Sequence, residues 1–208
     1  MFEFENMRYK DILFIEQLTI HQGEFTCIVG ESGGGKTTLL RLLNKMISPT
    51  EGNIYYHKQR LEQCPSVAHR MDVSLLSQQP VMFEGTIKDN LLYAVRLFQK
   101  DDVSDEELSD LLTQLKVKKK LSDDASLCSG GEKQRIALGR ILLKKSSVLL
   151  LDEPSSALDE KTEDLLLQIV SQYAKDHEVS VILVTHSSEV ASKYGQRIIR
   201  IESGRVIR

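Results

Sequence analysis

A glycine-rich run near the N-terminus, GESGGGKT (Gly30 to Thr37), has the residue types and spacing that bind phosphate. The glycines allow backbone N–H groups to close around a phosphate, and Lys36 supplies a charge that reaches the terminal phosphates of a nucleotide. The Thr37 hydroxyl can ligate Mg²⁺ at the same place. A glycine-rich turn that binds nothing is the alternative, but a strand predicted before the run and a helix after it favour the phosphate site.

Two carboxylates follow an apolar run in VLLLDEP, and they indicate a second part of the same site. Asp152 would hold Mg²⁺ through water, and Glu153 could be the general base that activates an attacking water, although such a pair can also simply cap a helix. His186 ends VSVILVTH, where it could hydrogen-bond the terminal phosphate or have a structural role. Gln78 follows VSLL and could coordinate Mg²⁺ or orient water, or be a surface amide.

The stretch CSGGEKQR (Cys128 to Arg135) combines a helix start with two glycines. Ser129 and Glu132 stand at the spacing of a capping box, which predicts that a helix begins here. Gly130 and Gly131 each cost that helix about 1 kcal/mol relative to alanine, so the bare backbone must serve another purpose. One purpose is a tight turn. Another is a helix N-terminus that binds an anion, and because the chain already has a phosphate loop, that anion would belong to a nucleotide held by another chain.

Strands and helices alternate along the chain. FEFENMRY, ILFIEQLTI and FTCIVG predict N-terminal strands, LLRLLNKM has helical leucine spacing, and NIYYH and VSLLSQ predict two more strands. We expect helix from Thr86 to Leu121, including one that Ser104 opens and that closes on the lysines of KVKKK, interpreted as a solvated helix end rather than a membrane or nucleic-acid patch. VLLLDEP and VSVILVTH are typical of buried parallel strands, KTEDLLLQIVSQYAKD of an amphipathic helix, and IIRIESGRVI of a hairpin.

This alternation predicts an α/β fold with a mostly parallel core sheet, an antiparallel N-terminal β layer and an α-helical subdomain. We expect one domain over residues 1–208. Within it, residues 1–78 and 135–208 would form the core and the β layer, and residues 79–134 would form the helical subdomain that carries the glycine-bearing helix start.

Composition narrows the possible functions. With 208 residues, 41% of them hydrophobic, the chain can bury a substantial core, and no apolar run approaches the roughly 20 residues that a bilayer crossing needs. The N-terminus does not resemble a signal peptide, so we expect a soluble, cytoplasmic chain that reaches a membrane only through a partner. The net charge of −3 favours no nucleic-acid partner. The three cysteines are widely spaced and suit a reducing compartment without disulfides or zinc.

Taken together, these motifs resemble the ATP-binding subunit of ABC transporters. GESGGGKT resembles the Walker A motif, VLLLDE the Walker B motif and CSGGE the LSGGQ signature, while Gln78 resembles the Q-loop glutamine, SALD (Ser156 to Asp159) the D-loop and His186 the switch histidine. The resemblance implies a P-loop NTPase with a RecA-like core that binds ATP and Mg²⁺ and hydrolyses ATP. It also implies an integral membrane permease as partner, a second ATPase subunit in an ATP-bound homodimer, and a peripheral location on the inner face of the cell membrane.

The resemblance also assigns roles to the matching residues. Glu153, His186 and Gln78 would be catalytic, and Thr37, Gln78 and Asp152 would hold the metal. In the head-to-tail dimer that the family forms, Ser129 and Gly131 would contact the γ-phosphate of the ATP on the other subunit, and Asp159 would help to couple the two sites. The full set of expected nucleotide-binding residues is Tyr9, Gly30, Glu31, Ser32, Gly33, Gly34, Gly35, Lys36, Thr37, Thr38, Ser129, Gly130, Gly131, Glu132 and Asp159.

Some positions depart from the family pattern. Cys128 replaces the usual leucine of the signature and Glu132 the usual glutamine, while the Ser-Gly-Gly core is intact. Tyr9 could stack on adenine, as an aromatic residue before Walker A does in the family, or it could be a core tyrosine. QQPVMFEGTIKDNL resembles the corresponding stretch of exporters, and the short chain with SPTEG resembles small bacterial subunits assigned to iron or metal export.

Two other classes fit less well. An ABC-type ATPase of DNA repair or chromosome architecture would act on a soluble or nucleic-acid partner, but those chains carry long coiled-coil insertions between Walker A and signature, and none fits here. ABC proteins that act on ribosomes usually carry two cassettes in one chain. A P-loop small-molecule kinase would explain GESGGGKT but not CSGGE, SALD or His186.

Overall fold

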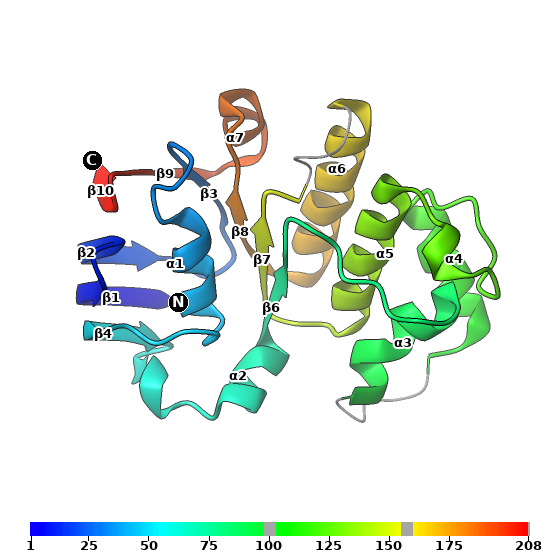
Figure 1. Cartoon of the computed structure of the whole chain (residues 1–208), viewed down its shortest axis with the longest axis horizontal. Helices are drawn as coiled ribbons and strands as arrows, with labels where there is room; N and C mark the ends of the chain where they lie inside the picture. The colour runs from blue at the N-terminus through cyan, green and yellow to red at the C-terminus, as the bar shows by residue number, and fades with distance from the viewer. Residues whose placement is uncertain (98–102, 155–159, 208) are drawn as a thin grey trace. The chain divides into compact units, whose positions relative to one another are not determined.

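The computed structural model describes residues 1–97, 103–154 and 160–207 (Figure 1). Its strands are β1 (Phe2–Tyr9), β2 (Leu13–Ile20), β3 (Phe25–Val29), β4 (Glu51–Tyr56), β5 (Gln59–Arg60), β6 (Val73–Leu76), β7 (Val148–Asp152), β8 (Ser180–Val184), β9 (Arg197–Glu202) and β10 (Arg205–Ile207). Its α-helices are α1 (Lys36–Leu43), α2 (Ser66–Asp72), α3 (Ile87–Leu97), α4 (Asp105–Gln114), α5 (Gly130–Leu143), α6 (Glu160–His177) and α7 (Ser188–Tyr194). Short three-ten helices span Leu61–Gln63 and Ala125–Leu127.

The described strands form one mixed sheet in the order β5-β4-β1-β2-β10-β9-β3-β8-β7-β6. β3 is parallel to both β8 and β9, and β7 is parallel to β8, so the predicted parallel core is confirmed. β1 is antiparallel to β2 and to β4, as the N-terminal pattern predicts. One register pair, Arg205 with Phe14, connects β2 to β10, so the antiparallel strands continue the sheet rather than stand apart from it.

The burial of each strand follows from its place in this sheet. Every residue of β7 and β8 is buried, which explains why neither strand alternates apolar with polar residues. In β1 the buried residues are Phe2, Phe4 and Met7. Asn6, with φ of 46°, lies where the register against β4 shifts, and this irregularity moves the alternation by one residue.

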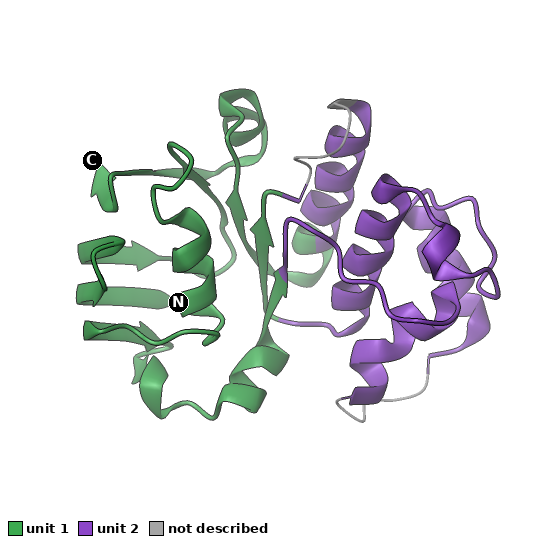
Figure 2. Cartoon of the chain, in the orientation of Figure 1, with its two compact units in different colours: residues 1–75, 147–153, 174–208 green, residues 76–146, 154–173 purple. Residues whose placement is uncertain are grey.

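The described chain divides into two compact units, coloured green and purple in Figure 2. Unit 1 comprises residues 1–75, 147–153 and 174–208, and unit 2 comprises residues 76–146 and 154–173. None of the described helices is long and apolar enough to cross a bilayer. The boundaries of the helical subdomain that the sequence leads us to expect, after residues 78 and 134, stay a prediction.

Helix α4 in unit 2 begins as the sequence predicts. The Ser104 N–H donates to Glu107 Oε2 at 2.9 Å, and the Glu107 N–H donates to Ser104 Oγ at 3.2 Å. Both bonds of the capping box are therefore present.

The end of α4 corrects the prediction of helix across residues 86–121, because α3 and α4 are separate helices and residues 115–121 are not helical. The Val117 N–H donates to Leu112 O at 2.9 Å and the Lys116 N–H to Thr113 O at 3.0 Å, which together make a Schellman motif. Lys116 has φ of 53°, a left-handed conformation that ends the helix. Lys118, Lys119 and Lys120 therefore follow the helix instead of closing it.

Gly139 lies in the interior of α5, and its place is explained by close packing in unit 2. A Cβ atom at this position would lie 2.7 Å from Leu115 Cδ1 and 2.9 Å from Leu91 Cδ2. Glycine costs a helix interior about 1 kcal/mol relative to alanine, so the close approach of α3 and the end of α4 must offset that cost.

We expect Gly139→Val to lower the free energy of unfolding by about 1–3 kcal/mol, the usual cost of overpacking a core. Urea unfolding followed by circular dichroism measures the change. Gly130→Ala is the control, because a Cβ atom there would have no neighbour within 4 Å. Equal stability of Gly139→Val and the unchanged chain would contradict the packing argument.

Candidate active site

The exits of three neighbouring parallel strands bring several of the predicted site residues together in unit 1. β3, β8 and β7 are adjacent and parallel, so their carboxyl ends share one edge of the sheet. Gly30 follows β3, Asp152 ends β7, and His186 lies just past β8. The Thr185 N–H donates to Ile28 O and the Glu153 N–H to Val184 O, each at 3.1 Å, so all three exits are held in register.

The phosphate loop packs closely on its neighbours, and this packing requires glycine at the first position of the loop, Gly30. A Cβ atom on Gly30 would lie 1.9 Å from Ile201 O, so no side chain fits there. Gly35, with φ of 97°, is the N-cap of α1. The other loop residues divide into exposed Glu31, Ser32 and Gly33, buried Gly34, and Thr38, which lies half-buried on α1.

The Lys36 ammonium is held inside this loop. The side chain is buried, and Nζ donates to Gly30 O at 3.0 Å and to Glu31 O at 2.7 Å. Burial lowers the pKa of Lys36, while the negative charges of Glu153 and Asp152 act in the opposite direction. A buried cation between loop carbonyls and two carboxylates is placed to meet the phosphates of a nucleotide.

Thr37 and Asp152 form a pair of oxygen donors. Thr37 Oγ1 donates to Asp152 Oδ1 at 2.9 Å. Burial raises the pKa of Asp152, and the hydrogen bond from Thr37 lowers it again in part. A hydroxyl and a carboxylate are oxygen donors of the kind that Mg²⁺ prefers, so Thr37 would ligate Mg²⁺ and Asp152 would hold it through water.

The described residues form no larger metal cage around this pair. Within residues 1–97, 103–154 and 160–207, no group of three or more His, Cys, Asp or Glu side chains is placed to hold a metal ion. Mg²⁺ at Thr37 and Asp152 would therefore need phosphate oxygens and water to complete its coordination, as Mg²⁺ in nucleotide sites usually does.

Glu153 and His186 contact each other directly. His186 Nε2 lies 2.6 Å from Glu153 Oε1, and the side chains are 44% and 18% exposed respectively. Glu153 has φ of 44°, a conformation that costs a residue other than glycine about 1–3 kcal/mol and that often marks a functional site. The strained backbone and the histidine together fix the direction of a carboxylate that water can still reach.

A cavity of about 200 Å³ beside the phosphate loop could hold the base of a nucleotide. It is lined by the turn between β1 and β2 and the turn between β9 and β10, including Phe14 and Arg205. The guanidinium carbons of Arg8 and Arg205 lie 5.6 and 5.1 Å from the centre of the Phe14 ring. A Cβ atom on Gly35 would lie 3.2 Å from Ile12 O, so the β1–β2 turn touches the loop.

Tyr9, the predicted adenine-stacking residue, ends β1 next to this cavity. It is half-buried and packs against the hydrophobic core of unit 1, with Lys10 Nζ 5.3 Å from its ring centre. Its role toward adenine stays a prediction. Phe14 and Arg205 were not among the predicted site residues, because they lie far apart in the sequence and no local spacing links them.

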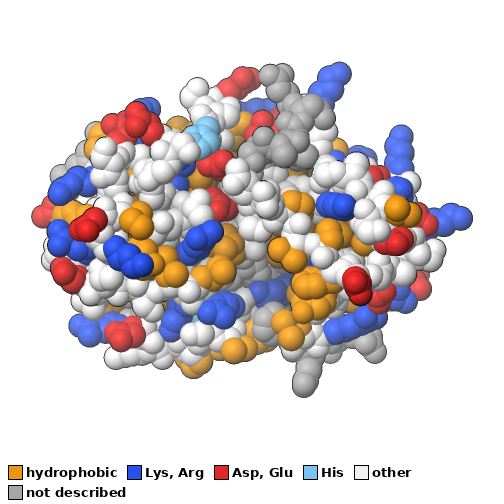
Figure 3. Space-filling view, in the orientation of Figure 1, with side chains coloured by type: hydrophobic (Ala, Val, Ile, Leu, Met, Phe, Trp, Pro, Cys, Tyr) orange, Lys and Arg blue, Asp and Glu red, His pale blue; other side chains and the backbone are white. Residues whose placement is uncertain are grey.

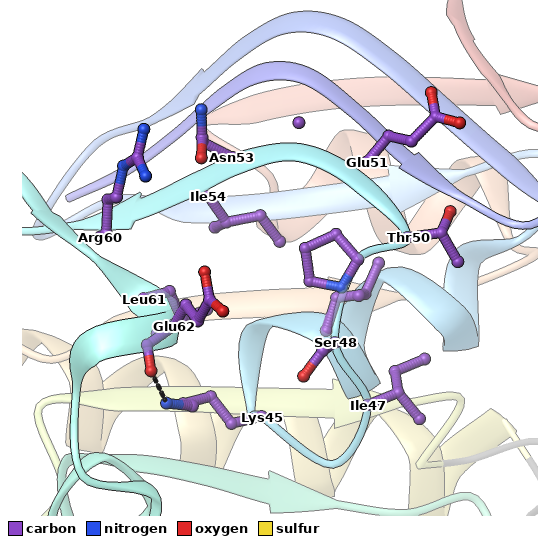
Figure 4. A pocket seen from close by; sticks show the side chains of 13 residues that line it. Lys45, Ile47, Ser48, Thr50, Glu51, Asn53, Ile54, Arg60, Leu61 and Glu62 are labelled. Carbon is purple, nitrogen blue, oxygen red and sulfur yellow. Dashed lines mark hydrogen bonds between the residues drawn. The ribbon is translucent and has the colours of Figure 1, made fainter.

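A second cavity in unit 1, of about 230 Å³, lies elsewhere (Figure 4). It is lined by Leu42 and Lys45 at the end of α1, by the loop that follows, and by Ile54 of β4. Lys45 Nζ donates to Glu62 O at 3.1 Å, the bond drawn as a dashed line. α1 starts at the phosphate loop, and this cavity adjoins its other end. None of the predicted site residues that the structure describes lines it.

In unit 2, the structure confirms the predicted capping box at the start of α5. The Ser129 N–H donates to Glu132 Oε2 at 2.8 Å, and the Glu132 N–H donates to Ser129 Oγ at 3.3 Å. Gly130 is exposed, and within the described chain the N–H groups of Gly130 and Gly131 have no hydrogen-bond acceptor. The exposed helix N-terminus can therefore accept an anion.

Gln78 and Asp159 are the two remaining predicted site residues. Gln78 is exposed in unit 2, after β6, and its predicted roles in catalysis and metal binding stay predictions. Asp159, with the rest of SALD, lies outside the described residues.

A family model described as "ABC transporter" matches residues 15–156, about two thirds of the chain. The chain is 33% identical to the energy-coupling factor transporter ATP-binding protein EcfA2 of Acetivibrio thermocellus over 193 residues, which cover 91% of this chain and 69% of that protein. The curated relatives differ in length, and the chain spans from 16% to 72% of them.

Solved structures agree with this match. A dimeric ATP-binding cassette, MJ0796, in a post-hydrolysis state with ADP and Pi, has a TM-score of 0.84 at 25% identity, covering 100% of this chain and 97% of that one. A bacterial Atm1-family ABC exporter with ATP bound has a TM-score of 0.87 at 27% identity, covering 100% of this chain and 38% of that one. The chain therefore belongs to the ABC transporter family, of which it is an ATP-binding and ATP-hydrolysing domain.

Proposed function

We propose that two copies of this chain bind two ATP molecules between them, head to tail, and that ATP hydrolysis drives a separate membrane permease. The observation that carries the dimer is the presence of two different phosphate-binding devices. Unit 1 has the loop, the Mg²⁺ donors and the carboxylate–histidine pair. Unit 2 has an exposed helix N-terminus, where the N–H groups of Gly130 and Gly131 have no acceptor among the described residues. In a head-to-tail dimer each copy would supply one device to each nucleotide.

The residues of unit 1 suit phosphoryl transfer to water. The loop and Lys36 hold the phosphates, and Mg²⁺ bound by Thr37 and Asp152 would neutralise charge on the phosphate oxygens. A water oxygen attacks the γ-phosphorus, the bond to the β–γ bridging oxygen breaks, ADP leaves, and the proton of the water passes to Glu153. His186 positions the Glu153 carboxylate through the 2.6 Å contact.

An exposed apolar patch on unit 2 is the surface that we propose for the permease. Val81, Tyr93 and Leu97 are 57%, 42% and 63% exposed. The Tyr93 ring stacks on Phe83, with ring centres 3.6 Å apart. Figure 3 shows hydrophobic side chains, in orange, around the segment between β6 and α3. Clustered apolar side chains on a surface are typical of sites that bind another protein.

Arg140 makes this patch rigid. Its guanidinium donates to Asn90 O and to Val81 O, each at 2.8 Å, and lies 4.7 Å from the centre of the Phe83 ring. The fully buried Asn90 side chain donates to Phe83 O at 2.9 Å and accepts from the Phe83 N–H at 2.8 Å. The patch is therefore held in place before any partner arrives, which lowers the entropy cost of docking.

The cargo and its direction are a finer proposal. The resemblance of QQPVMFEGTIKDNL to exporters and the similarity to an Atm1-family exporter support export, and SPTEG supports iron or another metal as cargo. One relative is described as a spermidine and putrescine import protein, so relatives of this chain work in both directions. We place the working chain on the cytoplasmic face of the membrane, attached through its permease.

We expect Glu153→Gln to lower the rate of ATP hydrolysis by at least about 100-fold, since general bases commonly contribute that much. The amide keeps the shape of the side chain but cannot take the proton. ATP binding should persist, and the variant should accumulate as an ATP-bound dimer, measured by light scattering after size exclusion. Unchanged turnover, or a failure to dimerise with ATP, would count against the proposed role.

Ser129→Arg should leave ATP binding to the monomer intact and abolish ATP-dependent dimerisation. The long cationic side chain would fill the space at the start of α5 that a phosphate needs. Isothermal titration with ATP and light scattering with ATP separate the two effects. Normal dimerisation and turnover would show that this helix start does not face a nucleotide on the other copy.

The permease surface is tested by purification from the native cell. Tagged Glu153→Gln chain, extracted in mild detergent, should bring down a stoichiometric polytopic membrane protein, and the added pair Val81→Lys and Leu97→Lys should abolish its recovery. Met46→Lys with Val67→Lys is the matched control, because these residues of unit 1 are 57% and 64% exposed. Recovery of ribosomal or chromosomal material without a permease would instead favour a machine that acts on a soluble or nucleic-acid partner.

A further inference from the structure

A groove of about 710 Å³ in unit 2, here called the lysine groove, lies outside every site described above. Among its lining residues, Leu112 and Val117 are buried and Leu121 is half-buried, so the lining is partly apolar. Lys88, Lys119 and Lys120 also line it, together with hydroxyl-bearing residues such as Ser109 and Thr113. Its volume is in the range of ordinary ligand and peptide pockets.

Backbone hydrogen bonds build the lysine groove. The Schellman motif at the end of α4 turns the chain at Lys116 and seats Val117 against the helix. The next segment is joined to the start of α3, because the Ile87 N–H donates to Asp123 O and the Lys88 N–H to Leu121 O, each at 2.9 Å. The groove therefore exists before a ligand arrives.

Its charge is unbalanced. Lys88 Nζ lies 2.5 Å from Asp105 Oδ1, and Asp105 is the one carboxylate in the described lining. Lys119 and Lys120 make no ion pair with a side chain in the described part of the chain. This positive rim contrasts with the net charge of −3 for the whole sequence.

We propose that the lysine groove binds an acidic, amphipathic peptide segment of a partner protein. Apolar side chains of the segment would lie on Leu112, Val117 and Leu121, and its carboxylates would pair with Lys119 and Lys120. This mode of binding combines an apolar groove with complementary charge at the rim. The lysine groove is a different surface from the exposed apolar patch of Val81, Tyr93 and Leu97, so this proposal does not depend on the proposed permease.

The composition of the groove favours a peptide over other polyanions. None of its described lining residues is aromatic or an arginine, so it offers no stacking surface of the kind that binds single-stranded nucleic acid. A bilayer surface is broad, whereas a concave groove suits a single chain segment. The Ser109 and Thr113 hydroxyls donate to Asp105 O and Ser109 O, so toward a ligand they would act as acceptors, for example of peptide N–H groups.

Peptide selection tests this inference on the full chain. Random peptides are selected on the immobilised protein, and their affinities are measured by fluorescence anisotropy. Enriched peptides should carry net negative charge with apolar residues between the acids, and should bind Lys119→Glu with Lys120→Glu at least about tenfold more weakly. Their affinity should also fall as salt is raised.

The matched control is Lys118→Glu with Lys175→Glu, which changes the net charge equally at two exposed positions outside the groove. This control should keep the affinity of the unchanged chain. The inference is overturned if no peptide is enriched, if enriched peptides lack net negative charge, if both double variants bind alike, or if an oligothymidylate probe competes for the groove.

Discussion

The parallel pairing of β3 with β8 and of β8 with β7 is the constraint on which the candidate site depends. It brings to one edge a buried aspartate, a histidine and a glycine loop that lies more than a hundred residues before both of them in the sequence. Backbone hydrogen bonds across the strand exits keep these residues in register up to the ends of the strands. The short contacts between Thr37 and Asp152, and between Glu153 and His186, follow from that register.

The glycines that look alike in the sequence have different physical reasons. At Gly30 the carbonyl of Ile201 excludes any side chain, whereas at Gly130 the surroundings are open and the bare helix start leaves N–H groups exposed. Gly139 is a third case, in which leucines from other helices approach the backbone of α5. Only the surroundings, and not the local sequence, distinguish a glycine kept for packing from one kept for binding.

The same distinction between local and distant determinants explains what could be predicted from the sequence. The capping box of Ser129 and the helix start at Ser104 are confirmed because each depends on residues within three positions of one another. The helical prediction across residues 115–121 is wrong because Lys116 adopts a left-handed conformation that its residue type does not signal. The spacing of residues along the sequence does not identify tertiary neighbours. For this reason it could not predict the contacts of Glu153 with His186 and of Arg140 with Asn90, or the cavity beside the phosphate loop.

The register pair between Arg205 and Phe14 gives the sheet a seam. On one side lie the antiparallel strands β1, β2 and β4, and on the other the antiparallel pair β10 and β9 leads into the parallel core. Across the seam, Arg205 pairs with Phe14, and the Phe14 N–H donates to Gly204 O at 2.7 Å. The same two residues line the cavity beside the phosphate loop. A nucleotide base bound in this cavity would contact residues from both sides of the seam, so that nucleotide binding would be coupled to the pairing of β2 with β10.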